Sequence, residues 1–218
     1  MTLRQVAFDI ETTGFNADDV VTVVGFAVPL GVRVFVNTGG RPAPAFEDVA
    51  EDVVVKVSTH SSEQGVLAAV AAFVEERFRQ ADVLLVAFNG ERWNGGFDLP
   101  FLRTRFARLD VTWPFVDVPY ADLLPVISKR FNTTVDGDES SDLAGAYDVL
   151  CEGSYGDIDP FTESAEAVPA FEAERFERLV AHNVADVLRT RALGRVAEEY
   201  CAKSEFQVKS LTATVHDT

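Results

Sequence analysis

The periods at which apolar residues recur along the chain predict its order of strands and helices. Residues 3–10, 20–28 and 31–37 are rich in apolar and β-branched residues, which favours strands, and the second and third of these segments predict a hairpin. From 62 to 80 the apolar residues recur at helical spacing, which predicts an amphipathic helix. The run 82–88 is nearly all apolar, as is typical of a strand covered on both faces.

Helical patterns dominate the second half of the chain. A Gly-rich loop, NGERWNGG, follows the apolar run at 82–88. The predicted elements after it are a helix beginning near Asp98, a short strand over 115–118, and helices over 121–131, 143–150 and 170–200. No repeat or composition shift marks a boundary, so the prediction is a single domain over residues 1–218.

Three strands followed by alternating helices and strands predict an α/β fold, with a mixed sheet flanked by helices. The first three strands would form an antiparallel meander, and the fourth would join the sheet in parallel through a helical crossover. In this topology the segment 3–10 lies near the centre of the sheet. A charged side chain on that segment therefore cannot be dismissed as solvated surface.

Composition narrows the kinds of protein to consider. The chain has 218 residues, 47% of them hydrophobic, which is enough for a full-sized core. Its net charge of −16, from 35 acidic and 19 basic residues, argues against nucleic-acid binding through a generally basic surface. Lys is scarce, as expected of a protein in concentrated salt, where the Debye length falls to about 3 Å at 1 M. A GC-rich genome would also favour Arg over Lys, so both interpretations stay open.

Sequence signals for a compartment are few. The N-terminus lacks the basic-then-apolar pattern of a signal peptide, and the most apolar stretch, 20–32, is shorter than the roughly 20 residues that a membrane span needs. Cys151 and Cys201 form neither a disulfide framework nor a closely spaced metal pair. The expectation is a cytoplasmic protein with reduced thiols and no membrane partner.

Two acidic residues stand within the first apolar segment, in the stretch FDIETTGF. Asp9 and Glu11 are two residues apart, so on a strand they project from the same face, while Ile10 points the other way. Neighbouring carboxylates repel each other, and burying either without compensation is costly. A divalent cation is the simplest compensation, because hard oxygen ligands suit Mg²⁺ or Mn²⁺.

Further carboxylates at the ends of other elements would complete such a site. Asp98, in FDLPFL, lies where a Gly-Gly loop enters a helix with Pro100 in its first turn, although an Asp there is equally an ordinary helix cap. Asp186 lies within a mainly apolar stripe of the last helix, with His182 one turn earlier on the same face. For this pair the alternative is a salt bridge in the core.

Taken together, these motifs resemble the DEDD superfamily of 3′→5′ exonucleases. The matching order is Asp-x-Glu in the first strand, Asn and then Phe-Asp after the fourth, and His four residues before Asp on the last helix. The resemblance spans about residues 6 to 193 and implies a ribonuclease H-like fold. It implies that Asp9, Glu11, Asp98 and Asp186 hold two divalent metal ions, Mg²⁺ or Mn²⁺, roughly 3.5–4 Å apart.

The resemblance also assigns a residue that positions and deprotonates the attacking water, and here the sequence departs from the pattern. His182 has the side chain of the His branch of the superfamily but stands four residues before Asp186, the spacing of the Tyr branch. A residue four positions back lies one helical turn away, within reach of the site. An imidazole with a pKa of about 6.5 suits a base near neutral pH. The alternative is an impaired site that binds metal but turns over slowly.

Substrate contacts are carried over by the same resemblance. Thr12, Thr13 and Phe15 match positions that flank the terminal nucleotide, although the threonines equally suit the turn that leaves the strand. The loop after Asn89 is longer than in the resembling motif. Its Trp93 would stack on a terminal base, worth about 1–3 kcal/mol per base, or else pack on a neighbouring loop.

These observations predict a metal-dependent 3′→5′ exonuclease that hydrolyses single-stranded DNA or RNA ends to nucleoside monophosphates. One alternative is an endonuclease or RNA hydrolase on the same fold. Another is a nucleic-acid-binding or scaffolding module with an impaired centre, suggested by the unusual spacing of His182 and by the acidic composition. The sequence shows no polymerase domain, so a proofreading or repair role would require a partner chain that the sequence does not identify.

Overall fold

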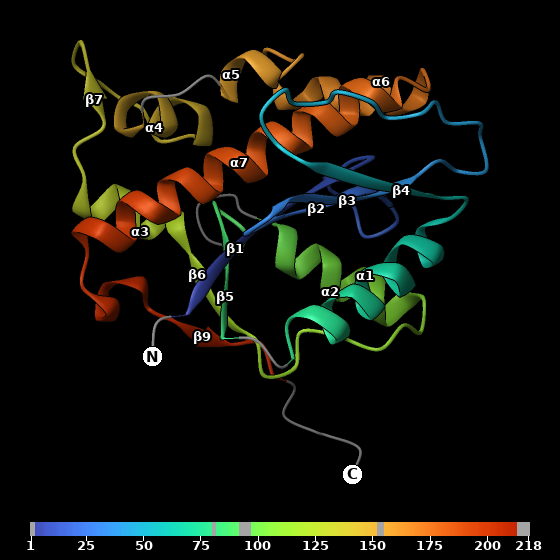
Figure 1. Ribbon diagram of the computed structural model, residues 1–218, viewed down its shortest axis with the longest axis horizontal. Helices are drawn as coiled ribbons and strands as arrows, with labels where there is room; N and C mark the ends of the chain where they lie inside the picture. The colour runs from blue at the N-terminus through green and yellow to red at the C-terminus, as the bar shows by residue number, and fades with distance from the viewer. Residues whose placement is uncertain (1–2, 80–81, 92–96, 152–154, 213–218) are drawn as a thin grey trace.

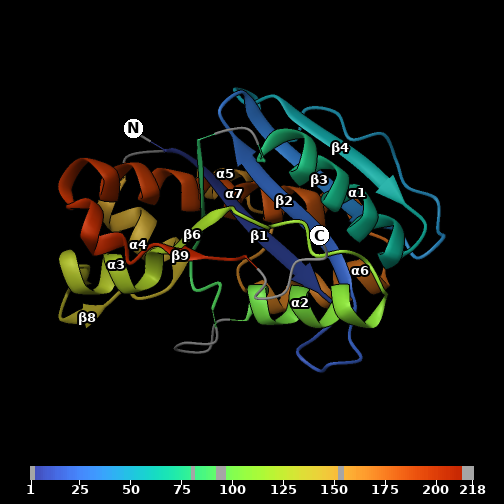
Figure 2. The ribbon, with the colours of Figure 1, turned by 90° about the horizontal axis from the view of Figure 1, so that it is seen from below.

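The computed structural model describes residues 3–79, 82–91, 97–151 and 155–212. A mixed sheet forms the middle layer, with α7 (Phe176–Tyr200) and the shorter helices near it on one face and α1 (Glu63–Arg77) and α2 (Asp98–Arg108) on the other (Figure 1). Seen from below, α1 and α2 lie in front of the strands and α7 crosses behind them (Figure 2). No helix within the described residues is long and apolar enough to cross a membrane.

The seven-stranded sheet has the order β4-β3-β2-β1-β5-β6-β9. Strands β1, β2 and β3 pair antiparallel, whereas β4 pairs parallel to β3, and β5 and β6 continue in parallel from β1. The strands are β1 (Arg4–Thr12), β2 (Val21–Val28), β3 (Gly31–Asn37), β4 (Val55–His60), β5 (Val83–Ala87), β6 (Pro119–Asp122) and β9 (Lys209–Ser210), with a separate hairpin of β7 (Thr134–Val135) and β8 (Asp138–Glu139).

The remaining helices lie mainly beside α7. They are α3 (Leu123–Arg130), α4 (Leu143–Leu150), α5 (Tyr155–Ile158) and α6 (Ala167–Glu172), with short 3₁₀ turns η1 (Ser164–Glu166) and η2 (Lys203–Phe206). This arrangement confirms the predicted α/β class and the antiparallel meander of the first three strands. It also confirms the parallel strand predicted at 82–88, which is β5 and follows helix α1. The first strand is central, with three strands on either side.

Alternation along β1 divides the core into two layers. Val6, Phe8 and Ile10 point toward α1 and α2, where they pack with the apolar residues of those helices. Ala7 points to the opposite face and packs under α7. Asp9 and Glu11 continue the alternation on the α7 face, so both carboxylates lie between the sheet and the longest helix.

Two predicted elements differ from the structure, and strand β4 is an addition to them. The strand expected over 115–118 lies instead at β6, because Phe115 and Val118 are buried loop residues that fill the core without pairing. The helix expected over 170–200 is two helices, interrupted at 173–175, where Glu174 has a φ of 58°. Strand β4 was not predicted, because its alternating half-exposed residues belong to a sheet edge and lack a continuous apolar run.

A close approach between β2 and α7 fixes the helix above the sheet. Gly25 on β2 pairs with Asp9, and a Cβ at position 25 would lie 1.9 Å from Oδ1 of Asn183. No side chain fits there unless the helix or Asn183 moves. The absence of a side chain at Gly25 therefore sets the distance at which α7 crosses β1.

We expect Gly25→Ala to destabilise the fold by about 1–3 kcal/mol, the usual cost of forcing an extra carbon into a packed core. Chemical denaturation measures this difference. Gly65→Ala is the matched control, because a Cβ there meets nothing closer than 3.4 Å, and Ala within a helix is favoured over Gly by up to about 1 kcal/mol. Equal midpoints for Gly25→Ala and wild type would show that the approach of α7 is not constrained at this point.

Candidate metal centre

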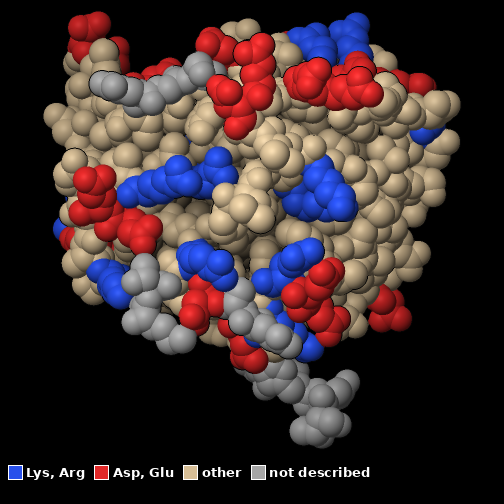
Figure 3. All heavy atoms as spheres, in the orientation of Figure 1, with Lys and Arg blue, Asp and Glu red and all other residues tan. Residues whose placement is uncertain are grey.

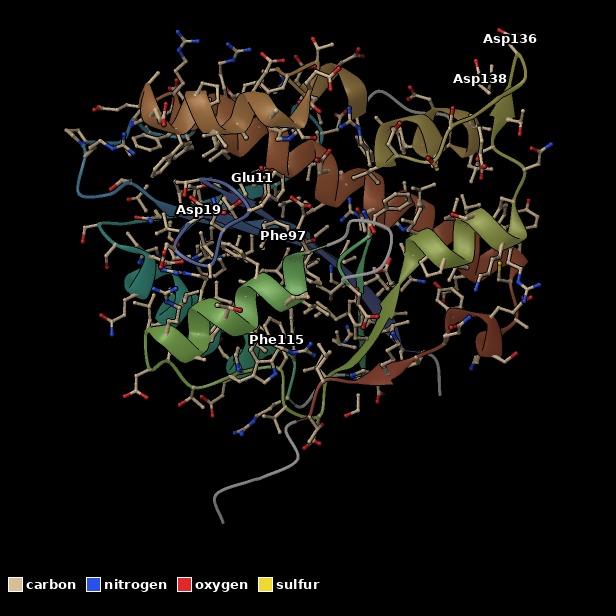
Figure 4. The ribbon with its side chains drawn as sticks, turned by 180° about the vertical axis from the view of Figure 1, so that it is seen from behind. Glu11, Asp19, Phe97, Phe115, Asp136 and Asp138 are labelled. Atoms are coloured by element: carbon tan, nitrogen blue, oxygen red, sulfur yellow. The ribbon has the colours of Figure 1, made fainter. Side chains whose placement is uncertain are left out.

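The carboxylates of β1 are held on a strand that cannot move independently. Asp9 and Glu11 pair with Gly25 and Val23 of β2, and the preceding residues of β1 pair with β5 on the other side. Glu11 is 8% exposed. It lies beneath α7 and near the beginning of α2, the side from which Phe97 and the 13–20 loop with Asp19 also approach (Figure 4).

Helix α7 brings two further groups over this strand. The Nε2 atom of His182 is 3.7 Å from Oε1 of Glu11 and 3.7 Å from Oδ2 of Asp186. These separations are too long for hydrogen bonds. One ligand atom from each of the three residues lies within 4.8 Å of the other two, an arrangement that is compatible with a bound metal ion.

Asn183 ties the same helix to Asp9. Its side-chain amide donates to Oδ2 of Asp9 at 2.9 Å, and it lies 3.3 Å from the carbonyl oxygen of that residue. The residue is fully buried at the contact with Gly25 described above. Asn183 therefore fixes the orientation of the Asp9 carboxylate with a neutral donor, which contributes no positive charge to the cluster.

Asp98 enters the cluster as the first residue of α2. The sequence left open a helix-cap role for it, but the cap position is Phe97 and has no side-chain capping hydrogen bond. The adjacent Leu99 N–H donates to the carbonyl of Gly90 at 2.9 Å and anchors the start of the helix. Burial, together with the charges of Asp122 and Asp186, raises the pKa of Asp98 to about 8.

The other carboxyl groups are perturbed in the same direction. Burial and the charge of Glu11 raise the pKa of Asp9 well above its usual range. Burial and the charges of Asp186 and Asp98 do the same for Glu11. The pKa of Asp186 is also raised by burial.

This electrostatic pattern fits divalent cations. Carboxylates that repel one another and are short of positive charge gain most from a hard dication, and their oxygens are the ligands that Mg²⁺ and Mn²⁺ prefer. The two residues of β1, Asp98 at the start of α2 and Asp186 on α7 would provide these oxygens from three separate elements. The structure thus places Glu11, His182 and Asp186 within 4.8 Å of one another, and the carboxylates of Asp9 and Asp98 lie near enough to raise the pKa of Glu11 or of each other.

An ion-paired network that the sequence analysis missed lies behind His182. Asp159, in the segment between α5 and η1, is 2.8 Å from the imidazole Nδ1 through its Oδ1. Its Oδ2 accepts from Nη1 of Arg189 at 2.7 Å, and the same Nη1 donates to Oδ1 of Asp186 at 2.7 Å. Nothing in the sequence around Asp159 points to this contact, because it depends on how an irregular segment packs against α7.

These contacts determine how the network is charged. Burial opposes the charged imidazole, but the Asp159 hydrogen bond and the charge of Asp186 outweigh it and raise the pKa of His182. Burial alone would raise the pKa of Asp159, but the hydrogen bond from His182 keeps the pKa of that carboxyl below its usual value. Positive charge is therefore concentrated on the α7 side of the cluster.

Arginines near the site are engaged within the protein. Arg189 is 7% exposed and bound as described. Arg105 is also buried, and its guanidinium forms a two-pronged ion pair with Glu63 at 2.8 and 2.6 Å. The Glu63 carboxylate in turn accepts the Val21 N–H at 2.8 Å, so the pair joins α1, α2 and β2. Breaking such a buried pair costs about 3–5 kcal/mol, so Arg105 is a structural residue.

Three of the candidate substrate residues lie in or beside the 13–20 loop. Thr12 donates to the Gly14 carbonyl at 2.8 Å and Thr13 to Asp19 at 3.2 Å, so both hydroxyls close the 13–20 loop. Phe15 at the tip of that loop is 84% exposed, with its ring 5.2 Å from that of Phe97.

The other two candidates, Asn89 and Trp93, follow β5 in the sequence. Asn89 has a φ of 62°, and its backbone N–H donates to Asp122 at 2.9 Å, which turns the chain as it leaves β5. Trp93 lies outside the described residues.

Charged side chains are unevenly distributed over the face shown in Figure 3. On the face shown in Figure 3, acidic side chains gather mainly along the upper edge, over the region of α4 to α6, while basic side chains form separate patches across the middle. No continuous basic surface appears on this face, as expected for a net charge of −16.

A mixed sheet with buried carboxylates on its central strand, covered by a long helix, defines an RNase H-like protein. A family model described as the RNase H superfamily matches residues 6–144, more than half of the chain, and the chain belongs to this superfamily. The match includes β1 and α2, while the helix that carries His182 and Asp186 lies beyond it. Comparison with curated proteins finds no match. Membership suggests a nuclease-type function on nucleic acid.

The raised carboxyl pKa values predict how stability depends on pH in protein stripped of metal. A carboxyl whose folded pKa lies above its unfolded value stabilises the fold when protonated, so for Asp98 stability is lost as the pH rises from about 4 to 8. We expect the melting temperature of chelator-treated protein to fall over this window and the stabilisation by added Mn²⁺ to grow.

Variants separate this effect from general charge repulsion. Asp98→Asn should reduce the loss between these pH values, since it removes one buried charge. Asp138→Asn, on the exposed β7–β8 hairpin far from the cluster in Figure 4, removes the same charge at the surface and should leave the pH profile as in wild type. A pH profile that is identical in all three proteins would contradict the assignment.

Proposed function

We propose that the protein is a metal-dependent 3′→5′ exonuclease of the DEDD type, which hydrolyses single-stranded DNA or RNA ends to nucleoside monophosphates. The observation that carries the proposal is the cluster of Glu11, His182 and Asp186 between β1 and α7, with the carboxylates of Asp9 and Asp98 close enough to interact with it electrostatically.

Asp9, Glu11, Asp98 and Asp186 would hold two divalent ions. When bound, such ions supply a water of lowered pKa and neutralise charge on the phosphate and the departing oxygen. The contribution of the chain is to hold the oxygens rigidly, since Asp9 is fixed by Asn183 and Asp186 by Arg189. Because these oxygens are already in place, ion binding would relieve the repulsion between the carboxylates without moving the backbone.

His182 would accept the proton of the attacking water at Nε2. Its Nδ1 already faces Asp159, which leaves Nε2 directed toward Glu11 and Asp186. Although burial opposes it, the hydrogen bond to Asp159 raises the pKa of His182. Positive charge held among the four acids would oppose a second charge on the imidazole, which favours the neutral form that can accept a proton.

Phe15 would contact the terminal base. A phenylalanine that is 84% exposed beside Phe97 offers an apolar face next to the start of α2, where Asp98 enters the cluster. Stacking of a base on such a ring tolerates any sequence. The bonds that Thr12 and Thr13 make inside the loop hold Phe15 in place, which gives them an indirect part in substrate binding.

The second candidate is a nucleic-acid-binding module with an impaired centre. It is favoured by the hydrogen bond between His182 and Asp159, which raises the pKa of the imidazole and so stabilises its protonated form. This candidate binds metal and nucleic acid without turnover. An endonuclease on the same fold differs from both by cutting internal bonds.

We expect 5′-labelled single strands, DNA and RNA in parallel, to be shortened from the 3′ end with Mg²⁺ or Mn²⁺. A KCl series identifies the salt range in which the protein works. Asp98→Asn should lower the rate by at least about 10²-fold, since even outer-shell residues of metal sites are worth 10–100-fold. Asp138→Asn, which removes an exposed carboxylate remote from the cluster, is the control and should match wild type.

The pattern of products separates the candidates. A ladder of shortened strands with nucleoside monophosphates supports the exonuclease, and internal fragments favour the endonuclease. Intact label in every lane, with calorimetry showing that Mn²⁺ binds, would overturn the proposal in favour of the binding module.

A further inference from the structure

Asp159 occupies a place in the site that none of the four carboxylates fills. It is on the opposite side of the imidazole from Glu11 and Asp186, with its Oδ1 2.8 Å from Nδ1 of His182. Its side chain is 7% exposed. The same Oδ1 accepts the Phe161 N–H at 3.1 Å, which anchors the carboxylate to its own segment.

The position of the proton on an imidazole decides what the ring can do. A carboxylate that accepts from Nδ1 holds the proton there, fixes the plane of the ring and leaves Nε2 with its lone pair exposed. In the other tautomer Nε2 carries the proton and cannot accept one from water. The ring must also stay oriented, because a misplacement of about 1 Å in a catalytic group can cost about 10²-fold in rate.

We propose that Asp159 is a positioning residue, which holds His182 in the tautomer and orientation that present a bare Nε2 to the carboxylate cluster. The inference rests on the proposed function for its catalytic consequence, whereas its structural content concerns the imidazole alone. Asp159 acts through His182 and contacts none of the four carboxylates that would bind metal, according to the hydrogen bonds and ion pairs of the described residues.

Arg189 extends the same arrangement to the metal site. Its Nη1 lies between Oδ2 of Asp159 and Oδ1 of Asp186, at 2.7 Å from each. The two oxygens of Asp159 thus form two separate contacts, an imidazole arm from Oδ1 to His182 and an arginine arm from Oδ2 to Arg189. His182 and Arg189 project from the same helix, two turns apart. The Asp159 carboxylate, which belongs to another segment, therefore links the imidazole to Asp186 through Arg189.

The two arms of Asp159 can be separated by substitution. An Asn at this position can place its side-chain oxygen at either the Oδ1 or the Oδ2 site. The Oδ1 site is favoured, because the oxygen there accepts from both His182 and Phe161, and the amide NH₂ then faces Arg189. Asp159→Asn should therefore preserve the acceptor for Nδ1 and weaken the arginine arm. Asp159→Ala removes both arms.

The decisive measurement is the nitrogen NMR spectrum of His182 at a pH where the imidazole is neutral, in the presence of Mg²⁺. His182→Gln identifies its signals among those of the three histidines. Wild type and Asp159→Asn should both show a single tautomer with the proton on Nδ1. Asp159→Ala should show a mixture or the opposite tautomer, while thermal melting confirms that the variant is folded.

The kinetic counterpart is a loss of kcat of about 10²-fold in Asp159→Ala with KM nearly unchanged, and a smaller loss in Asp159→Asn. An unchanged tautomer in folded Asp159→Ala would overturn the inference whatever the activity. If wild type itself lacks 3′→5′ activity, the proposed function fails, yet the NMR comparison still decides the role of Asp159.

Discussion

Repulsion among buried carboxylates is the constraint on which the rest of this structure depends. Asp9 and Glu11 are placed on the α7 face by the alternation of β1, and Asp98 and Asp186 are added from two helices. Burial raises the pKa of all four, and the charges of neighbouring acids raise it further for Asp9, Glu11 and Asp98. A group of acids under a packed helix is compatible with a cation site, because stability alone would favour apolar residues there.

The protein compensates for this repulsion unevenly. On the α7 side, Arg189 and His182 bring positive or protonatable groups to Asp186. Around Asp9 and Asp98 the contacts differ, since Asn183 is a neutral donor and the nearby Asp122 adds a further negative charge. The half of the cluster between β1 and α2 is thus the more strongly negative one, and a dication gains most there.

The sequence predicted the parts of this site that follow from local periodicity. The shared face of Asp9 and Glu11 follows from a period of two, and the one-turn relation of His182 to Asp186 follows from the helix. The central place of β1 follows from the order of elements. Periodicity did not predict β4, because its position at the sheet edge leaves its residues half exposed. It also predicted a strand at Phe115, which is apolar and buried but belongs to a loop.

Contacts from irregular segments could not be predicted in the same way. Asp159 reaches His182 because the chain between α5 and η1 packs against α7, and no spacing in the sequence records that contact. Gly25 is similar, since its importance comes from Asn183 on a helix far along the chain. In this protein the residues that would do chemistry follow sequence patterns, while those that hold them in place are visible only in three dimensions.

The use of arginine explains how an acidic chain can still act on nucleic acid under the proposed function. Arg105 and Arg189, which follow the site acids in sequence, are buried in ion pairs and are not available to phosphates. Affinity would then come from the metal ions and from stacking on Phe15, with few arginine–phosphate contacts. Since the salt dependence of binding grows with the number of phosphates neutralised, such a site keeps its affinity in salt that would release a basic binding surface. The net charge of −16 therefore fits the proposed site, because binding there does not rely on long-range attraction.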